Sequence, residues 1–302
     1  MLIAHSRWRR IATVVAAAVA LTTAVVAASA SPGSRWIVFS AHPDGAVVPQ
    51  LFRVHADGAG LEQITTGNGP AVSPGFSHAG TRLVFSRLGS GIFSANVDGT
   101  GLRRLTSNAR DSYPAWSPDG TRIAFLRLHG TDWRLFTMAA SGQGQKRLVQ
   151  APPAGRPTWT ADGKAIFIPA GGDLVKVDAQ SGRVIKYFGM TLDVQTAQTA
   201  SVSPDARTLV YVGPRISTGP PDCGDGRCPQ FGLYLARIPA PHRPRRIVND
   251  TGAAGWSPDG KTLVYVSKGA LTLRVVASGV ETTIATGANS ADGDAPPAWQ
   301  PR

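Results

Sequence analysis

The chain has 302 residues, of which 31 are Lys or Arg and 19 are Asp or Glu, so its formal net charge is +12. This charge either attracts anionic partners, such as polysaccharides, other acidic polymers and lipid headgroups, or simply keeps a solvated surface soluble. The basic residues are scattered along the chain and accompany no nucleic-acid-binding motif. The composition therefore excludes nucleic acid from the expected partners.

The first thirty residues predict export. Three arginines, Arg7, Arg9 and Arg10, precede an apolar stretch at 11–28 whose only polar residues are threonines, and Ala28-Ser29-Ala30 fits a cleavage site. We expect residues 1–30 to be a signal peptide or, alternatively, an uncleaved anchor, because the stretch approaches the length of a membrane span. In both cases residues 31–302 are expected to be exported: periplasmic, cell-wall-associated or extracellular.

One phrase recurs along the rest of the chain. Its clearest copies are WSPDGTRIAF at 116–125 and WSPDGKTLVY at 256–265, and weaker copies begin at Phe76, Trp159 and Val202. In its turn, Pro presets φ, Asp bonds nearby backbone and Gly supplies a positive φ. Alternating strands follow each turn. The spacing of most copies, roughly 40–45 residues, is typical of a four-stranded propeller blade.

The two ends of the chain complement each other. Residues 31–39 match the second strand of a blade and lack the first, whereas 297–302 repeat the first strand and the start of the turn at 114–119. We therefore predict an all-β fold for residues 31–302, a six-bladed β-propeller closed by pairing of the C-terminal strand with the N-terminal blade. Closure removes the open sheet edges that invite aggregation.

The phrase W-S-P-D-G-x-x-I/L-A/V-F/Y, with the segment DGTGLRRLT at 98–106, resembles the repeats of the TolB-like, WD-repeat-like β-propeller family. The resemblance covers about residues 31–302 and implies a protein-binding role in the cell envelope. We expect no N-terminal α/β domain of the kind that precedes the propeller in TolB itself. We also expect no peptidase activity of the kind found where a peptidase domain follows such propellers, in the prolyl oligopeptidase family.

Two cysteines, Cys223 and Cys228, lie in a long insertion of the fifth unit. An even cysteine count in an exported chain predicts one disulfide, which would close a small loop. A metal site with the neighbouring Asp222 and Asp225 is the alternative, but it lacks the further ligands of a closed zinc site. We expect no metal and no cofactor.

The loops of a propeller lie on two faces. The S-P-D-G turns are nearly identical, so their face is interpreted as structural, and the opposite face varies from blade to blade. Binding residues favour variable loops on a rigid scaffold. The candidate binding residues around the channel mouth on the variable face are Arg110, Asp111, Tyr113, His129, Asp132, Asp193, Gln195 and Asp292. Alternatively, these side chains simply cap turns.

Catalytic signatures are scarce. The sequence GWSPDG at 255–260 is explained by the repeat and is no nucleophile elbow, and the histidines share no repeat position. Four tryptophans do share one, which favours packing between blades over an aromatic sugar-binding ring: Trp116, Trp159, Trp256 and Trp299. No catalytic residue is predicted, and a non-enzymatic protein is favoured.

The sequence thus predicts a monomeric, exported module that binds a cell-envelope protein or peptide. One alternative is binding or lyase-type processing of carbohydrate or another anionic polymer at the channel. Another is an architectural or sensory domain that contacts the membrane only through an uncleaved leader.

Overall fold

The computed structural model describes residues 35–43, 47–148, 155–170, 173–189, 199–213, 232–238, 244–249, 251–286 and 296–301. The predicted leader and the two cysteines lie outside these ranges. Within them, no helix combines the length and apolarity needed to cross a membrane.

The described residues form six antiparallel four-stranded sheets, which we call blades A to F. The strands of blades A to C, from the innermost outward, are β24 (Ala298–Trp299), β1 (Trp36–Ala41), β2 (Gln50–His55) and β3 (Glu62–Gln63); β4 (Ala71–Phe76), β5 (Arg82–Arg87), β6 (Gly91–Asn96) and β7 (Arg103–Arg104); β8 (Asp111–Trp116), β9 (Arg122–His129), β10 (Asp132–Ala139) and β11 (Lys146–Arg147).

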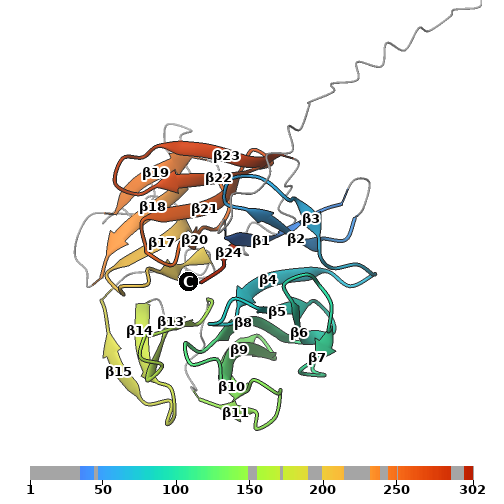
Figure 1. The fold of residues 1–302 in the computed structure, drawn as a ribbon. Coiled ribbons are helices and arrows are strands. Elements are labelled where there is room, and N and C mark those ends of the chain that lie inside the picture. Colours follow the sequence, from blue (N-terminus) through green and yellow to red (C-terminus); the bar gives the residue numbers. More distant parts are fainter. Residues whose placement is uncertain are drawn as a thin grey trace, which may run out of the picture.

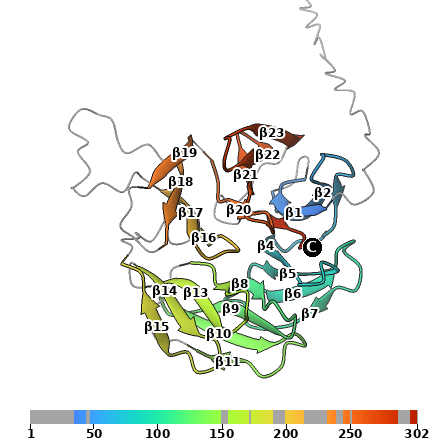
Figure 2. The same ribbon diagram turned by 60° about the vertical axis from the view of Figure 1, so that its left-hand side comes forward.

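Blades D to F repeat this order. Their strands are β12 (Thr158–Trp159), β13 (Ala165–Ala170), β14 (Asp173–Asp178) and β15 (Val184–Tyr187); β16 (Ser201–Val202), β17 (Thr208–Gly213), β18 (Gly232–Arg237) and β19 (Arg245–Asn249); β20 (Gly255–Trp256), β21 (Thr262–Ser267), β22 (Ala270–Val275) and β23 (Glu281–Thr286). Figures 1 and 2 show the blades arranged around one axis, and the predicted six-bladed propeller is confirmed.

The S-P-D-G turn has the predicted mechanism. In blade C, the Oδ1 of Asp119 accepts hydrogen bonds from the Ser117 hydroxyl at 2.5 Å and the Thr121 amide at 3.0 Å, and these bonds lower the pKa of Asp119 to about 2. Gly120 adopts a φ of 69°, a conformation that costs other residues energy. In blade E, Ala206 takes the same place with a φ of 58°.

The core lies between the blades. Six clusters of buried apolar side chains each join two neighbouring blades. Some hairpin glycines allow this close approach: a Cβ on Gly182 would lie 2.0 Å from the carbonyl oxygen of Leu148 in the preceding blade. Each blade is therefore stable only against its neighbours, as in other repeat proteins.

The last strand closes the ring. Strand β24 pairs with β1 in the register Ile37↔Trp299 and Val38↔Ala298. Gln300 extends the pairing: its amide donates to the carbonyl of Trp36 at 2.9 Å, and its side-chain Oε1 accepts from the Trp36 amide at 3.0 Å. Its Nε2 also donates to the Gly80 carbonyl of blade B at 2.8 Å. Figure 1 places β24 between β1 and β20, so both ends of the chain build blade A.

Deletion of residues 297–302 is expected to lower the free energy of unfolding by at least about 5 kcal/mol, because it removes a packed Trp and several backbone hydrogen bonds. Gln300→Ala, which keeps β24, should cost about 1–3 kcal/mol. Denaturant unfolding of the three proteins measures both losses. An unchanged midpoint in the truncated chain would contradict closure by β24.

Candidate functional site

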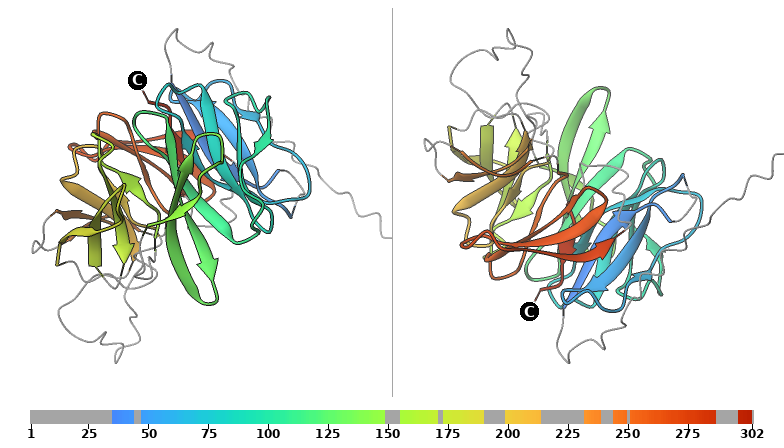
Figure 3. Two further views of the ribbon diagram at one scale, coloured as in Figure 1. Left: turned by 90° about the horizontal axis from the view of Figure 1, so that it is seen from below. Right: turned by 90° about the horizontal axis from the view of Figure 1, so that it is seen from above.

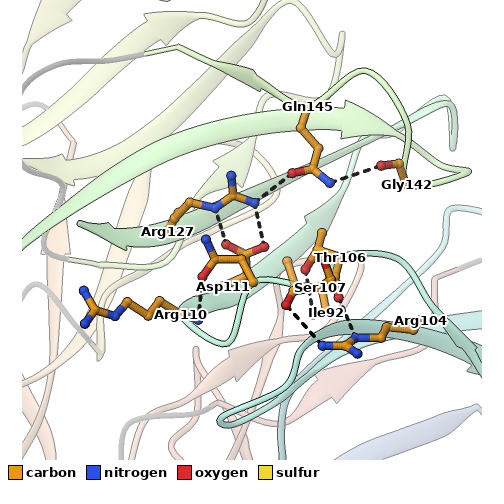
Figure 4. A network of polar contacts seen from close by, with 10 residues as sticks. Ile92, Arg104, Thr106, Ser107, Arg110, Asp111, Arg127, Gly142 and Gln145 are labelled. Carbon is orange, nitrogen blue, oxygen red and sulfur yellow. Dashed lines mark hydrogen bonds and ion pairs between the residues drawn. The ribbon is translucent and has the colours of Figure 1, made fainter. Parts of the chain in front are cut away.

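The predicted candidate Asp111 is buried in an ion pair. Its carboxylate is fully buried and accepts two hydrogen bonds from Arg127, from Nε at 2.6 Å and from Nη2 at 2.8 Å. Arg127 Nη2 also donates to Gln145 Oε1 at 2.7 Å, and the hydrogen bond to Asp111 raises the pKa of Arg127 (Figure 4). Asp111 therefore joins β8 to β9, and its carboxylate is not available to a partner.

Other candidates on the variable face are open to solvent. The side chain of Arg110 is exposed and points away from the ion pair in Figure 4. His129 and Asp132 are exposed opposite each other at the tip of the β9–β10 hairpin. Figure 3 shows this hairpin extending beyond the neighbouring blades on the side away from the C-terminal end.

Tyr113 is half-buried between blades C and D. Its ring packs edge-on against Trp133, with 5.7 Å between ring centroids. Its φ of 55° belongs to an irregularity in the β8–β9 register, and Ser73 has the same φ at the equivalent place in blade B. The described candidates on the variable face all lie in or beside blade C but differ sharply in exposure. Arg110, His129 and Asp132 are exposed, Tyr113 is half-buried and Asp111 is buried. Asp193, Gln195 and Asp292 lie outside the described residues.

A pocket opens at the other end of the channel, on the face of the S-P-D-G turns. Its volume is about 380 Å³. The residue that begins each repeated phrase lines it in all six blades: Phe76, Trp116, Trp159, Val202, Trp256 and Trp299. Prolines of the turns add to its wall, namely Pro118, Pro204, Pro258 and Pro301, and His78 occupies this position in blade B.

The ring of tryptophans both packs the blades and lines the pocket. The indole nitrogens of Trp159 and Trp256 donate to carbonyls of the preceding blade, Ala115 at 3.0 Å and Ser201 at 3.1 Å. Trp116 and Trp299 also pack against clusters between neighbouring blades, so the predicted packing role is confirmed for all four. The same side chains line the pocket because each ends the innermost strand of its blade, and this pocket was not predicted from the sequence.

Arg156 lies deepest among the pocket residues of blade D. The chain of blade D runs from inside the channel toward the S-P-D-G end, where Trp159 lies. Arg156 precedes Trp159 by three residues and therefore lies farther inside the channel. Its guanidinium reaches across to carbonyl oxygens of blades A and B: Nη1 donates to Pro296 at 3.5 Å, and Nη2 to Pro74 at 2.5 Å and to Ser73 at 3.4 Å. Burial lowers the pKa of Arg156 to about 10, and Tyr113 acts in the opposite direction.

The described residues at the two ends of the channel form no metal centre. Among the residues that the structure describes, no group of three or more His, Cys, Asp or Glu side chains could hold a metal ion. None of the described residues that line the pocket is acidic. Among these described lining residues, Arg156 is the only Arg or Lys. The pocket thus combines largely apolar walls with one positive charge.

These features define a six-bladed propeller with a channel pocket. The chain belongs to the TolB beta propeller domain family, whose model matches residues 12–163, half of the chain. Among solved structures, it is similar to TolB from Acinetobacter baumannii, with a TM-score of 0.71, 16% identity and coverage of 89% of this chain and 67% of that one. It also resembles putative TolB from Agrobacterium tumefaciens, with a TM-score of 0.55, 14% identity and coverage of 90% and 99%.

A curated relative is a dipeptidyl-peptidase 5 of Porphyromonas endodontalis, 27% identical over 192 residues. The match covers 59% of this chain and only 25% of the peptidase. The chain thus spans a quarter of that relative's length, and the structural likenesses show the fold alone.

Substitutions at the neighbouring residues Asp111 and Arg110 compare the contribution of the buried ion pair to stability with that of an exposed side chain. Asp111→Ala should lower the free energy of unfolding by about 3 kcal/mol, because it leaves Arg127 without its anion. Arg110→Ala should change it by less than about 0.5 kcal/mol. Thermal or denaturant unfolding compares the two variants, and equal effects would show that the ion pair does not support the blade.

Proposed function

We propose that this protein is an exported, non-enzymatic binding module of the cell envelope, which acts as a monomer and takes a segment of a protein or peptide into the pocket at the S-P-D-G end of its channel. The family supports a protein-binding propeller at this coarse level. The single observation that carries the choice of site is the ring of six equivalent side chains, four of them Trp, around one pocket.

The chemistry of this ring suits a polypeptide. Trp side chains contribute large contact areas with little loss of conformational freedom, and they are enriched among residues that dominate binding energy at interfaces. Aromatic-lined grooves also receive extended, proline-rich segments. The volume of about 380 Å³ lies near the lower end of ligand sites, which run from about 300 to 1,000 Å³, so it accommodates a chain end or a short stretch of chain.

Binding of an anionic polymer has less support. Basic pairs do lie on the exposed outer strands β7, β11 and β19. Two of these side chains nevertheless join blades, since Arg103 donates to the Ser141 carbonyl at 3.0 Å and Lys146 to the Gln180 carbonyl at 2.8 Å. Positive side chains on edge strands also prevent unwanted strand pairing. Packing and solubility therefore account for much of this charge.

Site-specific photo-crosslinking in the native cells tests the site. A photoreactive amino acid replaces His78, which is exposed at the pocket, or His129, which is exposed at the opposite face. We expect one envelope protein to be crosslinked from position 78 and not from position 129. Crosslinking from position 129 alone would move the site to the variable face. The absence of protein crosslinks from both positions would contradict a protein-binding module.

A further inference from the structure

Arg156 carries a positive charge that the described residues do not neutralise. Its guanidinium donates hydrogen bonds to three backbone carbonyl oxygens, which are neutral, and no acidic residue is among the described residues that line the pocket. With a pKa of about 10, the guanidinium remains charged at neutral pH. Arg156 is half-buried, and a partly desolvated charge without a counter-charge is costly, so a bound anion would relieve this cost.

The guanidinium also retains donors for a ligand. It carries five N–H groups, and the three bonds to carbonyls use Nη1 and Nη2 only, two of them to neighbouring oxygens of Ser73 and Pro74. A carboxylate accepts charge-assisted hydrogen bonds from such N–H groups and supplies the missing negative charge. Around it, the walls are aromatic and proline side chains, so the body of the ligand must be apolar.

We infer that the pocket binds a peptide through a carboxylate, which Arg156 receives at the inner end while the ring of Trp116, Trp159, Trp256 and Trp299 encloses the apolar residues next to it. The inference rests on the proposed function, because it names the chemistry of the peptide that the same pocket takes. Two sources supply this carboxylate, the free C-terminus of a chain or an acidic side chain within it.

The opposing role for Arg156 is purely structural. Its bonds connect blade D with blades A and B across the axis, separated by 82 and 140 positions in the sequence. If these bonds only hold the blades together, replacement of Arg156 should lower the stability of the fold. The protein should then show no preference for a negatively charged ligand. The two roles therefore differ in a ligand-binding measurement and not in a stability measurement alone.

Calorimetric titration of the full chain with three peptides distinguishes a ligand-binding Arg156 from a purely structural one. The probes are N-acetyl-Gly-Pro-Leu with a free C-terminus, the same peptide as its C-terminal amide, and the amide of N-acetyl-Gly-Asp-Leu. We expect the free acid or the Asp peptide to bind at least about tenfold more tightly than the uncharged amide, as for a hydrogen bond to a charged group. Whichever of the two binds more tightly identifies the source of the carboxylate.

Variants assign the preference to the residue. Arg156→Gln should bind charged and uncharged peptides equally, and Arg156→Lys should keep only part of the preference. Arg147→Gln is the matched control, because it removes an exposed positive charge from the outer strand β11 and should keep the full preference. The comparison among peptides in the unchanged protein decides the question even if Arg156→Gln does not fold.

Three outcomes overturn the inference, and they are distinguishable from one another. Equal affinity of the unchanged protein for charged and uncharged peptides would remove the carboxylate and leave the proposed peptide site standing. Failure of all three peptides to bind at 10 mM, roughly the weak end of measurable affinities, would remove the peptide pocket as well. A preference that persists in Arg156→Gln would assign the carboxylate to another residue.

Discussion

The pairing of β24 with β1 is the constraint on which the rest of the structure depends. Each blade buries its apolar faces only against its two neighbours, so an open ring would expose the faces of blades A and F that now form one cluster with Ile37, Val54, Val264 and Leu271. The residues that close the ring, Ala298 and Trp299, also line the pocket. Closure and the candidate binding site therefore depend on the same few residues.

The two ends of the channel differ in whether their charged side chains are paired with an opposite charge. On the variable face, Asp111 is satisfied by Arg127, and this pair supports the sheet. At the end that carries the S-P-D-G turns, Arg156 is half-buried beside aromatic side chains, and its hydrogen-bond partners are neutral carbonyl oxygens. An ion pair that is complete within the fold has little to offer a ligand, whereas a charge without a counter-charge is a common property of binding sites. This contrast favours the pocket as the place of binding.

The sequence was sufficient to predict the blades, because the repeated turn has local causes: Asp119 bonds the adjacent backbone, and Gly120 needs a positive φ. It also predicted the closure from two half-blades at the ends. It could not predict that Arg127 would neutralise Asp111, or that Arg156 would reach Pro74 and Pro296, because these contacts depend on how the blades are stacked. The tryptophans were visible in the sequence as a shared repeat position, which favoured packing between blades; that they also line a pocket depends on how the six innermost strands converge.

Native-state hydrogen exchange of the amides of Trp299 and Gln300 tests the central claim most directly. Chain termini ordinarily fray and exchange within the dead time, whereas amides that open only by global unfolding exchange at the slowest rates. If β24 closes the ring, the amide of Gln300, which donates to the Trp36 carbonyl, should exchange as slowly as the amides in the centre of β1. Fast exchange at Gln300 beside slow exchange in β1 would show that the ring is stable without its last strand, and would contradict the account.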